Sequence, residues 1–473
     1  MKNFKTLLKA SLLSMAAVCL ASCGDAVEGW NLKGTIENNA NELTLKSGAT
    51  MTSQESFENF NLKGKFQAAE GAEASIKFAS DGTSGYEVLI KNGPQDGTIK
   101  TGSLAHVRNL YRSLAEDGEW FDLEINVRGK NVAVAVNGTD VVCYTEPEKP
   151  YRTEANAKQL LGKGNAIIGV QKGEILIKDL TVTALAADAT NPNDTLPAID
   201  EQTDGAIRMQ QQDFPLIDMH VHLKGGLTKE QAHGMSMNYG INYGVAPNAG
   251  EGGVGRMLAD DAEVRSYLQE VKPLPFLCGV QGEGRKWTQT FSQEALNEFD
   301  YLFTDAMTII DAQGRNSRIY KPEEVHYDNG MDAYMDQIVD QTCLILNNEP
   351  ADIFANAFYL PEKDMNLEFD KYWTDERVNR VLDVMQKWDI ALEISARYKI
   401  PSKRIIKMAK DRGMKFTFGT NNVDANFGRL EYCIECVNEL GITKDMIWFP
   451  TMSKRPQHPV NIYNDFSKIK MQY

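Results

Sequence analysis

Short apolar runs that each end in a polar residue recur through the second half of the chain, and they constrain its fold more than any other feature. The runs are Pro215–Leu223, Tyr243–Asn248, Phe276–Glu283, Tyr301–Asp305, Ile353–Asn356, Ile390–Glu393 and Phe416–Asn421. Helix signals separate them, such as the capping-box spacing of Thr228 and Gln231. Strands that alternate with helices form parallel sheets. Seven or eight such units predict an α/β fold, a (β/α) barrel over residues 214–473.

The first run ends in two histidines, His220 and His222, which stand one residue apart. Side chains at positions i and i+2 share one face of a strand, so both imidazoles can bind the same divalent ion. A pair of hydrogen-bonded polar residues without metal is the alternative interpretation of this spacing.

Polar residues also end the other predicted strands, and barrels of this kind carry their active sites at the strand ends. Unpaired buried carboxylates are costly, so we predict one or two divalent ions, of Mn, Zn or Fe, at this rim. The predicted ligands are His220, His222, Glu283, Asp305 and Glu393. The predicted catalytic residues are Glu283, Asp305 and Arg285, and the predicted substrate-binding residues here are Lys224, Asn248, Asn356, Arg397 and Asn421. A hydrogen-bonded rim without metal remains the alternative.

Three motifs of this region resemble the polymerase and histidinol phosphatase (PHP) superfamily: Ile217–Leu223, Ala391–Ser395 and Ala409–Thr420. The resemblance implies that His220, His222 and Glu393 bind metal, with Glu283 as a further ligand. The chain departs from the family where Pro247-Asn248 replaces Asp-His, where Asp305-Ala-Met replaces a histidine, and where Gly419-Thr-Asn-Asn-Val replaces Gly-Ser-Asp-x-His. A trinuclear site like that of the family therefore does not follow. The amidohydrolase superfamily shares the His-x-His start but requires later strand-end histidines.

The first half of the chain has the pattern of β-hairpins. Apolar and polar residues alternate in Trp120–Val127, and Asn137-Gly138 separates two further apolar runs. Asn-Gly is the strongest short hairpin signal, because both turn positions need a positive φ. Many short strands at this spacing predict an all-β sandwich over residues 27–185.

Within that region, segments in the order Asn59–Phe66, Ser84–Ile90, Thr101–Leu104, Gly118–Trp120 and Val132–Gly138 resemble the 3-keto-disaccharide hydrolase family. The resemblance implies a concanavalin-like jelly roll with a sugar-facing surface that binds or cleaves carbohydrate. By position, Tyr86, Glu87, His106 and Arg108 are the residues expected at that surface, together with Tyr111. Each is also explicable as an ordinary sheet-face or loop residue.

The N-terminal end has the pattern of a bacterial lipoprotein signal. Residues 1–22 combine early lysines with an apolar middle, and Leu20-Ala-Ser-Cys23 has the form of a lipobox. We therefore expect export, lipidation at Cys23 and anchoring to the cell envelope. Residues 186–213 lack periodicity and predict a linker. The remaining cysteines form no disulfide pattern, and Cys433 and Cys436 lie in a predicted helix.

Charge and composition limit the function classes. A formal net charge of −15 without a Lys/Arg-rich block argues against nucleic-acid binding. The leading hypothesis is an envelope hydrolase or lyase that acts on a glycoside or 3-keto-glycoside, with metal in the barrel. The alternatives are a non-catalytic glycan-binding lipoprotein with a degenerate barrel, and a PHP-type phosphoesterase. The sequence leaves open the sugar, the oligomeric state and which domain is catalytic.

Overall fold

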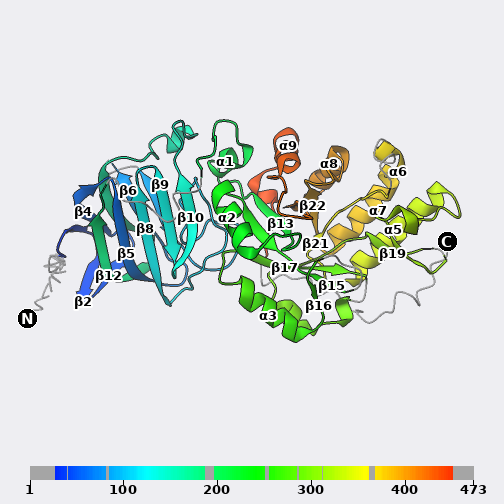
Figure 1. Cartoon of the computed structure of the whole chain (residues 1–473), viewed down its shortest axis with the longest axis horizontal. Coiled ribbons are helices and arrows are strands. Elements are labelled where there is room, and N and C mark those ends of the chain that lie inside the picture. Colours follow the sequence, from blue (N-terminus) through cyan, green and yellow to red (C-terminus); the bar gives the residue numbers. More distant parts are fainter. Residues whose placement is uncertain are drawn as a thin grey trace, which may run out of the picture.

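The computed structural model describes residues 27–39, 41–80, 85–186, 197–250, 255–284, 287–311, 313–361 and 368–450. A β-sandwich (blue and cyan) and a barrel (green to orange) lie side by side along the long axis of the molecule (Figure 1). The predicted signal segment 1–22 and Cys23 lie outside the described residues. No helix among the residues that the structure describes is long and apolar enough to cross a membrane.

Two antiparallel sheets form the sandwich, as predicted for this half of the chain. The first sheet has the order β1 (Trp30–Lys33), β4 (Thr50–Phe57), β11 (Gly164–Lys172), β6 (Glu73–Ser80) and β7 (Tyr86–Ile90). The second has the order β10 (Thr139–Thr145), β9 (Asn131–Val136), β8 (Trp120–Arg128), β5 (Phe60–Ala68), β12 (Glu174–Ala184), β3 (Glu42–Lys46) and β2 (Ile36–Asn39). The predicted turn between β9 and β10 is confirmed, with φ of 51° at Asn137 and 75° at Gly138.

A closed parallel barrel forms the second body, and each predicted apolar run supplies one of its strands. Within the described residues, seven strands pair in a ring: β13 (Ile217–Val221), β14 (Asn242–Val245), β17 (Leu277–Glu283), β18 (Tyr301–Thr304), β21 (Ile353–Phe354), β22 (Ala391–Ser395) and β23 (Phe416–Gly419). Pairing of β23 with β13 closes the ring. Two short strands, β15 (Asn248–Gly250) and β16 (Met257–Leu258), extend the sheet beside β17, and β19 (Thr308–Ile310) pairs with β20 (Asn316–Arg318).

Helices surround this barrel, and their apolar side chains pack against the outer faces of the strands. They are α2 (Lys229–Tyr239), α3 (Asp261–Val271), α4 (Gln293–Asn297), α5 (Met331–Asn348), α6 (Phe369–Tyr372), α7 (Asp375–Lys387), α8 (Lys403–Asp411) and α9 (Glu431–Leu440). The predicted capping box at the start of α2 is present, since Thr228 and Gln231 bond to each other's backbone.

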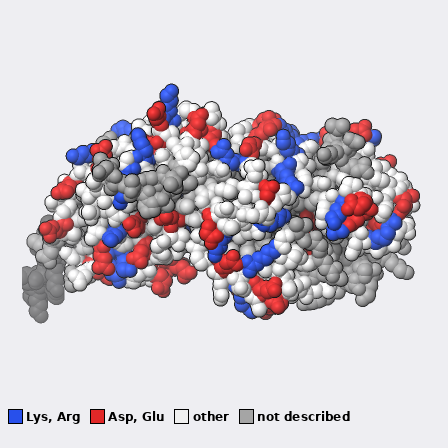
Figure 2. All heavy atoms as spheres, in the orientation of Figure 1, with Lys and Arg blue, Asp and Glu red and all other residues white. Residues whose placement is uncertain are grey.

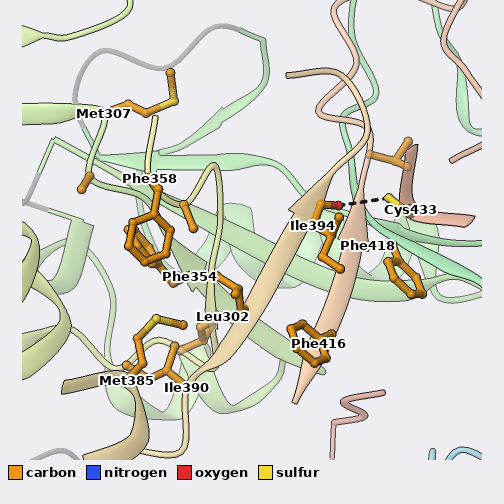
Figure 3. Close-up of a cluster of buried hydrophobic side chains, with 14 of the residues drawn as sticks. Leu302, Met307, Phe354, Phe358, Met385, Ile390, Ile394, Phe416, Phe418 and Cys433 are labelled. Atoms are coloured by element: carbon orange, nitrogen blue, oxygen red, sulfur yellow. Dashed lines mark hydrogen bonds between the residues drawn. The ribbon is translucent and has the colours of Figure 1, made fainter. Parts of the chain in front are cut away.

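Figure 3 shows part of the core between strands and helices. Ile394 and Phe416 extend from neighbouring strands, and Met385 of α7 packs close to Ile390. Cys433 of α9 is fully buried, and its thiol lies 3.2 Å from the carbonyl oxygen of Ile394. Cys433 and Cys436 both lie in α9, as predicted, and both are buried.

Charged side chains are mixed on the molecular face in view. Figure 2 shows blue Lys and Arg interspersed with red Asp and Glu on both bodies. The expected lack of nucleic-acid binding stays a prediction.

The predicted linker 186–213 is only partly a linker. Residues 187–196 lie outside the described residues, but the chain that follows is packed, and it includes helix α1 (Gly205–Gln210). Glu201 is buried and accepts hydrogen bonds from the Tyr144 hydroxyl at 2.9 Å and from Arg152 Nη1 at 2.8 Å. Met209 joins the barrel core. The segment lacks hydrophobic periodicity, yet its second part is not a linker, because individual long-range contacts hold it in place.

A loop of the sandwich closes one end of the barrel. Tyr111, between β7 and β8, belongs to the same buried cluster as Ile217, Leu277 and Tyr301, the first residues of β13, β17 and β18. These residues mark the N-terminal end of the parallel strands. The sandwich therefore lies at the end of the barrel opposite to the predicted site.

Arginines of the same loop bind the ends of two barrel helices. Buried Arg108 donates to the carbonyl oxygens of Met237 at 3.0 Å and Asn238 at 2.9 Å, in the last turn of α2. Arg112 donates to the carbonyl oxygens of Lys272 and Leu274, just after α3. Carbonyl groups at helix C-termini lack partners within the helix and favour a cation. The loop therefore fixes the sandwich to the barrel.

Candidate functional site

The C-terminal end of the barrel gathers buried polar side chains from several strands. A closed ring of hydrogen bonds joins five of them: His220, Gln281, Asp305, Asn356 and Glu393. Each of these residues is at most 4% exposed. Burial of so many polar groups is tolerable only when they are paired, and the ring provides this pairing.

The ring begins at His220, whose Nδ1 lies 2.6 Å from Glu393 Oε1 and whose Nε2 lies 3.2 Å from Gln281 Oε1. Gln281 Nε2 donates to Asp305 Oδ2 at 3.0 Å, and Asn356 Nδ2 donates to the same oxygen at 3.4 Å. The backbone N–H of Asn356 donates to Glu393 Oε2 at 2.6 Å and closes the ring. Asn421 Nδ2 donates to Asn356 Oδ1 at 3.1 Å from outside the ring.

Hydrogen-bond roles determine which protons His220 carries. An ionised carboxylate only accepts, so Gln281 turns its amide nitrogen toward Asp305 and its oxygen toward His220. Glu393 accepts as well, so His220 donates through both nitrogens and is positively charged. Burial, the largest effect, lowers the pKa of His220, but attraction and hydrogen bonding from Glu393 outweigh it and raise that pKa above its usual value.

His222 is in the opposite state. Its Nδ1 lies 2.8 Å from the carbonyl oxygen of Ala246, so Nδ1 carries the proton and Nε2 is left as an acceptor. Burial lowers the pKa of His222 well below its usual value, and the nearby charge of His220 lowers it further. The two rings are 5.0 Å apart between centroids. A neutral imidazole therefore stands beside a charged one.

Three residues that position the histidines were not among the predicted site residues. They are Gln281, Asp218 and Asn422. Asp218 accepts from the backbone N–H groups of His220 at 3.1 Å and Thr420 at 3.0 Å, and burial raises its pKa to about 6. Asn422 bonds both backbone groups of His222. The sequence does mark two of these residues, since Asp218 and Gln281 are polar residues inside apolar runs.

Glu283 contacts another of the predicted site residues. Asn248 Nδ2 donates to Glu283 Oε1, so these two predicted site residues pair with each other. Asn248 and His222 also line a cavity of about 310 Å³ that opens between α2 and α3. Its other lining residues are Leu223, Leu227, Thr228, Lys229, Glu230, Ala246, Pro247, Arg256, Tyr267 and Glu270.

The predicted cations differ in their placement. Lys224 is half-buried at the rim, where burial lowers its pKa. Arg397 is exposed and donates to the carbonyl oxygen of Asn421 at 3.0 Å. The predicted catalytic Arg285 lies outside the described residues.

The donor set does not fit the predicted metal centre. Across the part of the chain that the structure describes, no three His, Cys, Asp or Glu side chains are grouped so that they could hold an ion. Both ring nitrogens of His220 are hydrogen-bonded, one to Glu393 and the other to Gln281. Glu283 accepts a hydrogen bond from Asn248. We therefore derive no catalytic step from a metal.

The residues predicted for a sugar-facing surface of the sandwich are instead close to the barrel or buried. Tyr86 is fully buried and donates to Glu146 Oε2 at 2.6 Å. His106 Nδ1 lies 2.7 Å from Asp213 Oδ1, and Arg108 binds the end of α2. Glu87 is half-buried on β7. Tyr86 and Arg108 are therefore not at an open surface, because Tyr86 is buried in the sandwich and the loop that carries Arg108 docks on the barrel.

Comparison with known proteins concerns the sandwich. Residues 23–183 match the 3-keto-alpha-glucoside-1,2-lyase-like domain family. The match confirms the resemblance of the N-terminal domain, and the PHP resemblance of the barrel stays a prediction. None of the curated proteins with which we compared the chain matches it.

Two solved structures that are similar to this chain each cover a third of it. A putative glycosyl hydrolase from Parabacteroides distasonis ATCC 8503 has 12% identity and a TM-score of 0.31, covering 33% of this chain and 89% of its own. A carbohydrate binding module from Bacillus subtilis has 13% identity and a TM-score of 0.26, covering 33% of this chain and 96% of its own. A carbohydrate-related function follows for this domain from the family match.

Proposed function

We propose that this protein is a carbohydrate-processing hydrolase or lyase of the cell envelope, and that its chemistry takes place at the C-terminal end of the barrel. The observation that carries the proposal is the pair of adjacent histidines in opposite states beside a cavity. Two titratable groups whose environments separate their pKa values are the usual pattern of an acid and a base in one site.

His222 is the proposed general base. Its Nδ1 is committed to Ala246, so its tautomer is fixed and Nε2 carries the lone pair that accepts a proton. In hydrolysis that proton comes from water. In elimination from a 3-keto sugar it comes from the carbon between the keto group and the anomeric carbon. A double bond then forms between this carbon and the anomeric carbon, the bond from the anomeric carbon to the glycosidic oxygen breaks, and the leaving oxygen takes the proton from His222. The positive charge of His220, held by Glu393, stabilises negative charge that develops nearby.

The sandwich supports the choice of carbohydrate as substrate through its family match. Tyr86 and Arg108, two of its predicted surface residues, are engaged in internal contacts, which favours the barrel as the catalytic body. Polar groups on the cavity wall, such as Asn248 and Arg256, suit hydroxyl-rich ligands.

The test is an assay of the full chain on glycosides and 3-keto-glycosides. His222→Gln removes the base at similar size, and we expect activity to fall by about 10²–10⁴-fold. Glu87→Gln in the sandwich is the matched carboxylate-to-amide control and should retain activity. Loss in Glu87→Gln with activity retained in His222→Gln would assign catalysis to the sandwich instead.

A non-catalytic glycan-binding lipoprotein is the second candidate. The neutral amides of Asn248 and Asn421, at positions where the resembled PHP family has a histidine and an aspartate, favour it. Sugar binding by calorimetry, lost in Asn248→Leu, combined with no turnover of any glycoside tested, would support this candidate over the enzyme.

A further inference from the structure

The two carboxylates at the centre of the barrel are satisfied by groups of the protein itself. Glu393 bonds to His220 through one oxygen and to the backbone N–H of Asn356 through the other. Asp305 accepts from the amides of Gln281 and Asn356 and from the backbone N–H of Met307 at 3.0 Å. A buried carboxylate with such donors has no need of a cation.

Gln281 lies between the two residues that an ion would have to join. Its oxygen is 3.2 Å from His220 Nε2, and its nitrogen is 3.0 Å from Asp305 Oδ2. A divalent ion bound to both would need each atom within about 2.0–2.2 Å. The amide group fills that space, and its dipole matches the donor on one side and the acceptor on the other.

Neutral side chains also stand at neighbouring strand ends. Asn356 and Asn421 follow β21 and β23 with φ of 47° and 44°, a backbone region that asparagine tolerates better than most residues. Their amides bond to each other and add no negative charge. The ring therefore contains two carboxylates, and each of them is bonded to groups of the protein itself.

We infer that the hydrogen-bond ring takes the place of a divalent ion in this barrel, and that Gln281 is the residue that keeps an ion out. The inference concerns what the site binds and does not depend on the proposed activity. It changes the interpretation of the strand-end pattern: residue types typical of metal ligands serve here as members of a closed polar network.

The test is the metal content of the full chain. Wild type is purified without chelators, incubated in turn with Mn, Zn and Fe(II), separated from free ion and measured by plasma mass spectrometry. We expect far less than one ion per chain and no metal-dependent rise in Tm. Gln281→Glu puts a carboxylate at the same point and should gain one bound ion per chain, with a higher Tm in metal because binding stabilises the folded state.

Two further variants make the result specific. Gln281→Met keeps the side-chain length but adds no carboxylate, and it should bind no metal. His220→Ala combined with Gln281→Glu should lose the gained ion. Stoichiometric metal in wild type that disappears in His220→Ala would overturn the inference. So would a folded Gln281→Glu that binds no metal, because Gln281 would then not be what excludes it. If Gln281→Glu does not fold, the wild-type measurement decides by itself.

Discussion

Tyr111 of the sandwich packs against Phe449 of the barrel domain, with ring centroids 5.7 Å apart. Both belong to the cluster that fills the N-terminal end of the barrel, Tyr111 as a fully buried member. The sandwich is thus part of the barrel's packing, and not a module attached only by a linker.

Replacing Tyr111 tests this coupling. Tyr111→Ala should lower the free energy of unfolding by about 3–5 kcal/mol, because it leaves a cavity between the two bodies. Tyr111→Phe keeps the ring and should change it by less than about 1.5 kcal/mol. Denaturant unfolding followed by fluorescence and by circular dichroism gives both values. A small effect of Tyr111→Ala, with two separate transitions already in wild type, would show that the bodies unfold independently.

The contact between His106 and Asp213 should make stability depend on pH. The hydrogen bond that His106 donates to Asp213 is the largest cause of the raised pKa of His106. Because the folded pKa is the higher one, the stabilisation is fully present below the unfolded pKa of about 6.5 and is lost as the pH rises through the folded pKa.

Asp213→Asn removes this dependence. The difference in Tm between wild type and Asp213→Asn should be largest below pH 6.5 and shrink toward alkaline pH. Asn tolerates the φ of 55° at this position. Asp179→Asn is the matched control, since Asp179 is exposed and has a φ of 53°. A Tm difference that stays constant with pH would contradict the predicted role of the pair.

Lipidation at Cys23 is a prediction from the sequence. Cys23→Ala should move the protein from the membrane fraction to the soluble fraction of the envelope, which fractionation and immunoblotting measure. Ser22→Ala keeps a small residue in the lipobox and should leave the protein with the membrane. Unchanged membrane association of Cys23→Ala would exclude this thiol as the anchor.

The sequence by itself determined the elements and their order, because these depend on local chemistry. Apolar runs ended by polar residues located every strand of the barrel, from Ile217–Val221 to Phe416–Gly419. Asn137-Gly138 specified a hairpin, since few other pairs adopt positive φ at both positions. The same runs also located the polar strand ends, including His220, Asp305 and Glu393.

Only the tertiary structure decided which of these polar residues meet, because each partner comes from a different strand and the pairing depends on barrel closure. Gln281 stands out in the sequence as a polar residue inside an apolar run, but only the fold shows that β17 places it between His220 and Asp305. Three of the predicted metal ligands, His220, Asp305 and Glu393, belong to a hydrogen-bond ring. Arg108, predicted at a sugar-facing surface, binds the C-terminal end of α2. Residue type sets what a side chain can bind, and the packing of distant segments sets what it does bind.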